Sequence, residues 1–304
     1  MLAFVAPGQG AQSPGMLTPW IEDSAAKTLL TEWSSAIDLD LVRLGTTADA
    51  DEIKDTANAQ PLIVAAGLLG ARALNSKNIF SFVAGHSVGE ITAAALAEVI
   101  SEVDAMKLVR ARGIEMAKAA AVKPAGMSAV LGGDREVVLR AIADLGLVAA
   151  NDNGGGQIVA AGDLDALGQL APEGARVRSL AVAGAFHTSY MQPAVAPLRE
   201  LAAAIEVKDA KCGVISNKDG EVIRNGREIL DRIVAQISNP VRWDLCMTTL
   251  SQNISGALEV PPAGTLVGLL KRAVPIVETF ALKAVADIAL ADEFALRHNQ
   301  EVSN

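Results

Sequence analysis

The chain has 304 residues, 51% hydrophobic and 20% charged, which suits one large globular domain or two ordinary ones and excludes a disordered chain. Its 26 basic and 35 acidic residues give a net charge of −9, which argues against general nucleic-acid binding. Two cysteines without a Cys-x-x-Cys pattern, no apolar run of membrane-spanning length and no basic leader segment predict a cytoplasmic protein without a disulfide scaffold, zinc site or membrane anchor.

Strands and helices alternate along the chain, which predicts an α/β fold with a sheet covered on both faces. A glycine loop at residues 7–12 follows the first predicted strand. The elements predicted before residue 125 are strands at 2–6 and 79–83 and helices at 28–37, 61–74, 91–97 and 103–121.

The order of elements changes in the middle of the chain. We predict strands at 127–132, 147–150, 157–161 and 175–180 and helices at 136–143 and 163–170. This β-α-β-β-α-β order is the ferredoxin-like split, with its central turn at 151–156, Asn-Asp-Asn-Gly-Gly-Gly. We therefore expect a ferredoxin-like subdomain at 125–186, inserted into a large domain made of 1–124 and 187–304. The large domain resumes with helices at 190–205 and 227–237 and strands at 257–260 and 274–280.

The sequence Gly85-His86-Ser87-Val88-Gly89 lies between a predicted strand and a predicted helix. A Gly-x-Ser-x-Gly in this context is the nucleophile elbow, a sharp turn that presents the serine hydroxyl at a helix N-terminus. Backbone N–H groups there can stabilise an oxyanion. The alternative is an ordinary tight turn with a serine helix cap. Because the strand–turn–helix context is the one the motif requires, we favour Ser87 as a nucleophile.

A serine nucleophile needs a base, and the chain has three histidines. His86 is next to Ser87, and adjacent residues on an elbow point apart, so we expect His86 to pack under the turn. His298 lies in a polar C-terminal stretch and is expected to be a solvated surface residue. His187, in a small-residue loop after the inserted subdomain, is therefore the predicted general base.

Arg112 has apolar neighbours on its predicted helix: Leu108, Val109 and Met116 lie at i−4, i−3 and i+4. One explanation is a snorkelling side chain whose charged end reaches solvent. The other is a substrate carboxylate, which the planar guanidinium can bind through two parallel hydrogen bonds.

Five stretches of the chain together resemble the malonyl-CoA:acyl carrier protein transacylases, in their actinobacterial form. The resemblance runs along nearly the whole chain and is far more specific than the elbow alone. The matching stretches are residues 6–12, 85–90, 112–113 with Met116, 184–187 and 239–243.

The resemblance implies a hydrolase-like large domain with a mostly parallel sheet and an inserted ferredoxin-like subdomain. It also implies that Ser87 attacks the malonyl thioester, that His187 is the base and that Arg112 binds the malonyl carboxylate. Backbone N–H groups of Gln9 and Val88 would form the oxyanion hole. The implied partners are malonyl-CoA and an acyl carrier protein, with no metal or redox cofactor, no nucleic acid and no membrane.

The resemblance further implies that a backbone carbonyl at Arg242 orients His187, although Asp152, Asp163 and Asp165 lie between Ser87 and His187 in the sequence. Phe186 before the histidine is implied to line the acyl pocket and, like Val88, follows the malonyl-selective pattern.

Two stretches depart from the family pattern: Gly-Gly-Gly at 154–156, and 260–264, which replaces a Gly-Pro-Gly. For docking the acidic carrier protein, the candidate basic residues are Lys107, Lys118, Lys123, Lys271 and Arg272.

Two alternatives to a transacylase remain open at this point. A serine thioesterase or esterase would use the same elbow, but it would orient its histidine with a side-chain acid and hydrolyse the acyl-enzyme. A non-catalytic subunit that binds carrier protein would keep Ser87 only as a structural residue. The sequence leaves open the oligomeric state, the carrier protein and the choice between fatty acid and polyketide synthesis.

Overall fold

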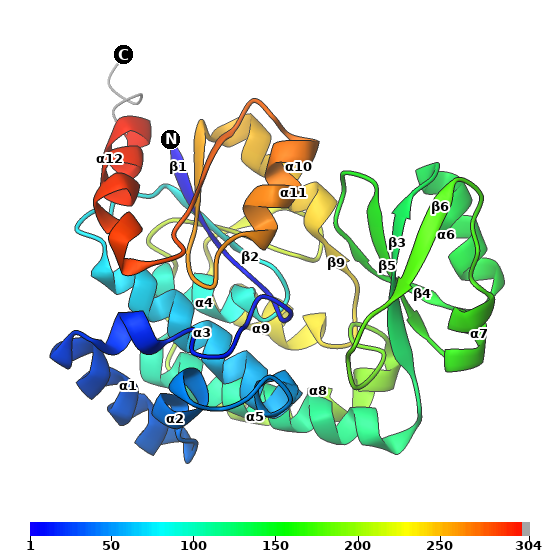
Figure 1. Cartoon of the computed structure of the whole chain (residues 1–304), viewed down its shortest axis with the longest axis horizontal. Helices are drawn as coiled ribbons and strands as arrows, with labels where there is room; N and C mark the ends of the chain where they lie inside the picture. Colours follow the sequence, from blue (N-terminus) through cyan, green and yellow to red (C-terminus); the bar gives the residue numbers. More distant parts are fainter. Residues whose placement is uncertain (300–304) are drawn as a thin grey trace.

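The computed structural model describes residues 1–299, which form two sheets side by side with helices around them (Figure 1). The first sheet has the order β11-β10-β1-β2-β7-β8 and is parallel except for β8 at its edge. Its strands are β1 Leu2–Ala6, β2 Phe82–Gly85, β7 Gly213–Ile215, β8 Val222–Ile223, β10 Gly256–Glu259 and β11 Glu278–Ala281.

The second sheet has the order β6-β3-β5-β4-β9. Its first four strands pair antiparallel in ferredoxin-like order, and β9, from further along the chain, adds in parallel to β4. Its strands are β3 Gly126–Gly132, β4 Val148–Asp152, β5 Gln157–Gly162, β6 Ala175–Ser179 and β9 Val241–Arg242. The predicted fold class is confirmed, while the boundaries at 125 and 186 remain predictions.

Helices cover both faces of the first sheet, because successive strand side chains point to opposite faces. Leu2 and Phe4 of β1 belong to the larger core, whereas Ala3 and Val5 pack against α10 and α11 on the other face. The helices are α1 Ser24–Ile37, α2 Leu41–Thr46, α3 Thr56–Ala73, α4 Gly89–Leu96, α5 Glu102–Val122, α6 Arg135–Asp144, α7 Leu164–Gln169, α8 Gln192–Ala203, α9 Gly226–Gln236, α10 Trp243–Asn253, α11 Thr265–Ala273 and α12 Ile288–Asn299.

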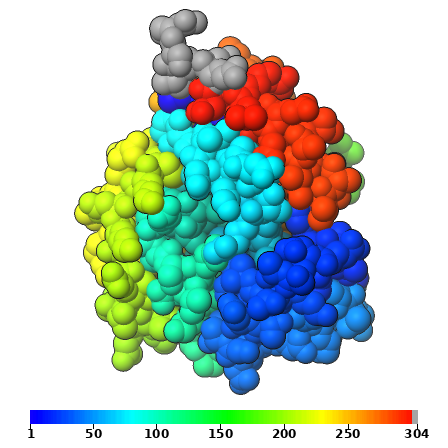
Figure 2. All heavy atoms as spheres, turned by 90° about the vertical axis from the view of Figure 1, so that its left-hand side faces the viewer, coloured from blue at the N-terminus to red at the C-terminus, as the bar shows by residue number. Residues whose placement is uncertain are grey.

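At the end of the molecule away from the second sheet, an early segment of the chain lies beside α12. Figure 2 shows the N-terminal segment in blue beside the start of α12 in red, and Trp20 and Ile288 line one surface pocket there. None of the helices in residues 1–299 is long and apolar enough to cross a membrane.

Three details differ from the predicted elements. The strand before the elbow runs from Phe82 to Gly85, not from 79 to 83. The strand expected at 274–280 begins only at Glu278, because Val274 caps α11 and a turn follows. The helix expected from 190 starts as a 3-10 turn at Ser189–Met191 before α8.

Candidate active site

The turn between β2 and α4 places Ser87 in a left-handed backbone conformation, φ 54°. A Cβ on Gly85 would lie 2.0 Å from the backbone of Gly89, so strand and helix can approach this closely only if residue 85 is glycine. The Ser87 N–H donates to Asn217 Oδ1 at 2.8 Å. The sharp turn expected for a nucleophile elbow is therefore present, and Ser87 is not the helix cap, since α4 is capped by Val88.

His187 lies in the loop before the Ser189–Met191 turn, also with a left-handed backbone, φ 61°. Its Nε2 is 2.7 Å from Ser87 Oγ, and its Nδ1 is 2.9 Å from the main-chain oxygen of Gln236. A carbonyl can only accept, so Nδ1 carries the hydrogen and the Nε2 lone pair faces the serine hydroxyl. This is the geometry a general base requires.

The carbonyl that orients His187 belongs to Gln236, so the expectation for Arg242 was wrong. Gln236 is the last residue of α9, and carbonyls of a last helical turn have no partner within the helix. Arg242 lies on β9 and pairs with Asp244 at 2.7 Å instead.

The aspartates between Ser87 and His187 have other partners or positions. Asp152 pairs with Arg135 at 2.7 Å, Asp163 caps α7, and Asp165 is exposed in the first turn of that helix. Within residues 1–299 no carboxylate hydrogen-bonds to His187.

The His187 imidazole is held neutral. It is 3% exposed, and burial lowers its pKa to about 3, with the positive charge of Arg112 adding to the effect. The neutral form is the one that can accept the Ser87 proton. The histidine is therefore in its basic form across the neutral pH range.

Arg112 is 1% exposed, so it is not a snorkelling side chain. Its guanidinium donates to the side-chain oxygens of Gln60 at 2.7 Å and Gln236 at 2.9 Å, and to Ser87 Oγ at 3.3 Å. Burial lowers its pKa to about 10, so it stays charged near neutral pH. It makes no ion pair with any carboxylate of the described chain. A buried cation with only neutral partners, beside a candidate nucleophile, is suited to an anionic substrate group.

Two backbone donors flank Ser87. The loop after β1 and the elbow after β2 lie at the same sheet edge, because Ala6 pairs with Gly85 in the parallel register. In the part of the chain that the structure describes, the N–H groups of Gln9 and Val88 have no acceptor. Free N–H groups at this edge are what an oxyanion hole needs.

Ser87 and His187 open into a cavity of about 250 Å³. Phe186 lines this cavity, as expected for the acyl pocket, and the second sheet contributes Asn151, Gln157 and Val159. The cavity is thus built from both sheets. No three His, Cys, Asp or Glu side chains in residues 1–299 form a group that could hold a metal ion.

The positions of the other two histidines, His86 and His298, can be compared with those expected. His86 was expected to pack under the turn, but it is half-buried and lines the same cavity as Ser87. Its ring makes a T-shaped contact with Trp243, and its Nε2 is 2.8 Å from Asn153 Oδ1. His298 was expected on the surface, but it is 4% exposed and hydrogen-bonds to Ser255 Oγ at 2.9 Å. The expectation was wrong because α12 turns the face that contains Phe294 and His298 toward the protein.

Four polar residues around the site were missed: Gln60, Glu90, Asn217 and Gln236 are all buried. Glu90 and Gln60 had a signal in the sequence, because each is a polar residue at the edge of an apolar helical run. Asn217 and Gln236 had none, since their contacts come from segments distant in the sequence.

The two stretches that depart from the family pattern, 154–156 and 260–264, each have a local structural explanation. All three glycines of 154–156 have positive φ, between 54° and 76°, which explains why three glycines fit this turn. Glu259, before the second departure, accepts the N–H groups of Gly264, Leu266 and Val267 at 2.9–3.0 Å and so holds the start of α11.

Comparison with known proteins shows the family of the chain. A family model described as "Acyl transferase domain" matches residues 3–290. The chain is 50% identical over 303 residues to the "Malonyl CoA-acyl carrier protein transacylase" of Mycobacterium tuberculosis, covering 97% of this chain and 99% of that relative. The relative with the same name from Bacillus subtilis is 34% identical over 304 residues, covering 95% of this chain and 96% of its own length.

Solved structures show the same similarity. The crystal structure of MCAT from Mycobacterium tuberculosis matches with a TM-score of 0.93 at 50% identity, covering 96% of this chain and 99% of that one. A type II PKS acyl-carrier protein in complex with its malonyl-transacylase provides a chain with a TM-score of 0.89 at 30% identity, covering 96% of this chain and 99% of that one. The resemblance to the malonyl-CoA:acyl carrier protein transacylases is confirmed, and the chain belongs to this acyl transferase family.

Proposed function

We propose that this protein transfers the malonyl group of malonyl-CoA to the phosphopantetheine thiol of an acyl carrier protein, supplying the extender unit for fatty acid synthesis. The observation that carries the proposal is the buried guanidinium of Arg112, 3.3 Å from Ser87 Oγ and without a carboxylate partner in residues 1–299. A malonyl group on Ser87 has a free carboxylate to fill that position.

The first half-reaction forms an ester on Ser87. His187 Nε2 takes the hydroxyl proton, Ser87 Oγ attacks the thioester carbon, and the backbone N–H groups of Gln9 and Val88 stabilise the oxyanion. The C–S bond then breaks, and the coenzyme A thiolate takes the proton from His187. The malonyl group is left as an oxygen ester on Ser87.

The second half-reaction reverses these roles. The carrier thiol gives its proton to His187 and attacks the ester carbon, and the C–O bond to Ser87 breaks. Ser87 recovers its proton from His187, and malonyl leaves as a thioester. All groups that act in this ping-pong scheme come from the chain, so we propose that it needs no cofactor beyond its two substrates.

The alternatives fit the site less well. A thioesterase is expected to orient its histidine with a side-chain acid, whereas His187 uses the carbonyl of Gln236. A non-catalytic carrier-binding subunit would not need Ser87 and His187 at 2.7 Å.

We propose that the carrier protein docks beside α11. Leu266 and Leu269 of that helix line the cavity, and Lys271 and Arg272 are exposed in its last turn. A Cβ added to Gly155, in the turn between β4 and β5, would lie 3.6 Å from the Cβ of Arg272, so the end of α11 is close to this turn of the second sheet. These two cations suit an acidic partner, whereas Lys118 already pairs with Glu115.

The test is to incubate the protein with malonyl-CoA and weigh the intact chain. One malonyl group is expected on the wild type, none on Ser87→Ala, and one on Ser251→Ala, a serine on α10 outside the site. Adding carrier protein should discharge the ester far faster than water does. A malonyl ester on folded Ser87→Ala, or hydrolysis faster than transfer, would contradict the proposal.

A further inference from the structure

Gln236 links Arg112 to a buried carboxylate that the reaction scheme above does not use. An arginine side chain carries only donors, so the side-chain oxygen of Gln236 must face it, as the 2.9 Å contact shows. The amide nitrogen of Gln236 must then point away from Arg112 and find acceptors. It donates to the side chain of Glu90, to the main-chain oxygen of Ser87 at 3.1 Å and to Asn217 Oδ1 at 3.1 Å.

Glu90 also supports the turn that presents the nucleophile. Its other oxygen accepts the main-chain N–H of Asn217 at 2.7 Å. The Asn217 side chain in turn accepts the Ser87 N–H at 2.8 Å and donates to the Gly85 carbonyl at 2.7 Å. Two chains of hydrogen bonds, called arms below, thus start at the Glu90 carboxylate. One arm runs through Gln236 to Arg112, and the other runs through Asn217 to Ser87.

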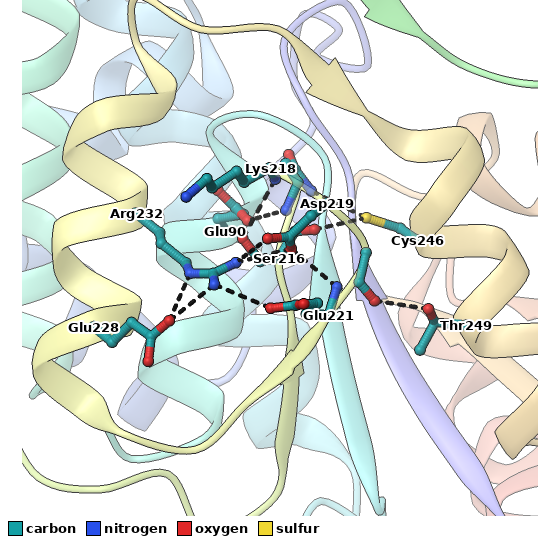
Figure 3. Close-up of polar contacts among 11 residues, drawn as sticks. Glu90, Ser216, Lys218, Asp219, Glu221, Glu228, Arg232, Cys246 and Thr249 are labelled. Carbon is teal, nitrogen blue, oxygen red and sulfur yellow. Dashed lines mark hydrogen bonds and ion pairs between the residues drawn. The ribbon is translucent and has the colours of Figure 1, made fainter.

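Glu90 has no ion-pair partner of its own within the described chain, although it is 3% exposed. Figure 3 shows Arg232 close by, but its guanidinium is already paired with Asp219 at 2.7 Å, Glu228 at 2.8 Å and Glu221 at 3.2 Å. Burying a carboxylate that is not in an ion pair is costly, even with the charges of Arg112 and Arg232 nearby, so stability alone does not explain it. Both oxygens meet N–H donors, which suits an ionised carboxylate, because a protonated one would turn its hydrogen toward one of these donors.

We propose that Glu90 is a positioning residue for the malonyl carboxylate: by accepting from the Gln236 amide it fixes which end of that amide faces Arg112, and so aims the guanidinium at the acyl group on Ser87. The inference rests on the proposed malonyl transfer and adds to it a residue that touches neither substrate nor Ser87 Oγ.

Glu90→Gln separates the two arms. Its single side-chain oxygen can still accept from Asn217, but its new amide nitrogen then faces the amide nitrogen of Gln236. Gln236 must lose this bond or turn over and present N–H groups to Arg112, where donor meets donor. The contact with Arg112 is therefore disturbed, while the bond from the Asn217 N–H to residue 90 and the bond from the Ser87 N–H to Asn217 are kept.

The experiment compares kcat/KM for malonyl-CoA and acetyl-CoA with carrier protein as acceptor. In Glu90→Gln the preference for malonyl should fall about tenfold or more, because a hydrogen bond to a charged group is disturbed, while acetyl transfer changes little. Asp292→Asn is the matched control. Asp292 is 8% exposed and accepts from Asn75 and Ser76 at 2.6–3.3 Å, so its loss should lower stability without changing the preference.

A double-mutant cycle with Arg112→Ala shows whether Glu90 acts through Arg112. Once Arg112 is absent, Glu90→Gln should produce no further loss of preference. An equal loss for malonyl and acetyl, or the same loss in both backgrounds, would make Glu90 a structural residue and overturn the proposal. Failure of malonyl transfer itself is distinguishable, because the wild type would then form no malonyl ester on Ser87.

The pH dependence of the wild type gives a second measurement, which does not require the Glu90→Gln variant to fold. Burial raises the pKa of Glu90 to about 7, and the charged or titratable groups around it are Arg112 on α5, Arg232 on α9 and Cys246 on α10. Protonation places a hydrogen between Glu90 and one of its donors. The malonyl preference should therefore fall as the pH is lowered through 7, and Arg112→Ala should show no such fall. A preference that is constant with pH would overturn the proposal.

Discussion

The main-chain oxygen of Gln236 lies 2.9 Å from Nδ1 of His187, while the side-chain oxygen of the same glutamine lies 2.9 Å from Arg112. One residue at the end of α9 therefore serves the candidate base through its backbone and the candidate carboxylate-binding arginine through its side chain. A substitution at this position keeps the main-chain contact with His187 and removes the side-chain contact with Arg112, together with the side-chain bonds to Glu90, Ser87 and Asn217.

Gln236→Met should leave His187 oriented and remove the acceptor from Arg112. We expect acetyl transfer to stay within a few-fold of wild type and malonyl transfer to fall about tenfold or more, because the bonds that link Gln236 to Arg112 and to Glu90 are both lost. Turnover of the two coenzyme A esters by one purified variant checks this. Equal losses for both esters would show that the side chain also supports the base.

His187→Ala should slow the formation of the Ser87 ester by at least about 10²-fold, because general-base assistance is removed. His298→Ala should leave the rate of ester formation unchanged and lower the free energy of unfolding, since His298 is buried against Ser255 and Phe294. Time-resolved intact mass after adding malonyl-CoA gives the rates, and urea unfolding gives the stability. Slow acylation by His298→Ala with normal acylation by His187→Ala would identify the other histidine as the base.

Arg112→Ala should abolish the preference for malonyl over acetyl. In the wild type an acetyl group leaves the buried guanidinium unpaired, and breaking such a pair costs about 3–5 kcal/mol, which corresponds to a preference of roughly 10²–10³. The measurement is competitive transfer from an equimolar mixture of malonyl-CoA and acetyl-CoA. If the wild type transferred malonyl and acetyl groups equally well, Arg112 would not be the residue that binds the malonyl carboxylate.

The buried His187 and Glu90 should make opposite contributions to stability as the pH changes. The pKa of His187 is lowered from 6.5 to about 3, so between these values only the unfolded chain binds the proton, and stability is lost as the pH falls. The pKa of Glu90 is raised from 4.5 to about 7, so its contribution is present below 4.5 and is lost as the pH rises through 7.

Two variants separate these contributions. On acidification from pH 7 to 4.5, His187→Gln should lose less free energy of unfolding than the wild type, and Glu90→Gln should lose more. Urea unfolding at several pH values checks both signs. Identical pH dependence in all three proteins would mean that neither group titrates as its burial requires.

Gly85→Ala should prevent folding or abolish activity, because its Cβ would lie 2.0 Å from the Gly89 backbone, which cannot move aside. Gly168→Ala is the matched control, since a Cβ there meets nothing within 4 Å. Circular dichroism and thermal unfolding of the two variants make the comparison. An active, stable Gly85→Ala protein would show that the elbow does not need this close approach.

The sequence was informative about the site where its chemistry is concentrated in a short stretch. Ser87 sits in a motif with a required strand–turn–helix context, and Arg112 stands out against its apolar helical neighbours. The orienting carbonyl could not be predicted in this way. Every residue has a carbonyl, and the one left free depends on where α9 ends and on how its end meets the loop of His187.

The elements of the fold also divide into those that the sequence could predict and those that it could not. The β-α-β-β-α-β order between residues 125 and 186 could be predicted because its strands are long enough to show a pattern. Strands β7, β8 and β9 have only two or three residues, too few for an alternating pattern, and they were missed. His298 was misplaced because its neighbours in sequence are polar, whereas its neighbours on the buried face of α12 are apolar.

Ser87 and His187 both have the left-handed backbone that glycine adopts without strain and other residues adopt at a cost of about 1–2 kcal/mol. The backbone strain at both positions therefore lowers the thermal stability of the protein, and it is tolerated because the two side chains are needed there. Inert copies made for trapping a carrier complex should consequently carry glycine, not alanine, at residue 87 or 187. The glycine versions should melt at the higher temperature, because alanine keeps the backbone strain after the useful side chain has gone.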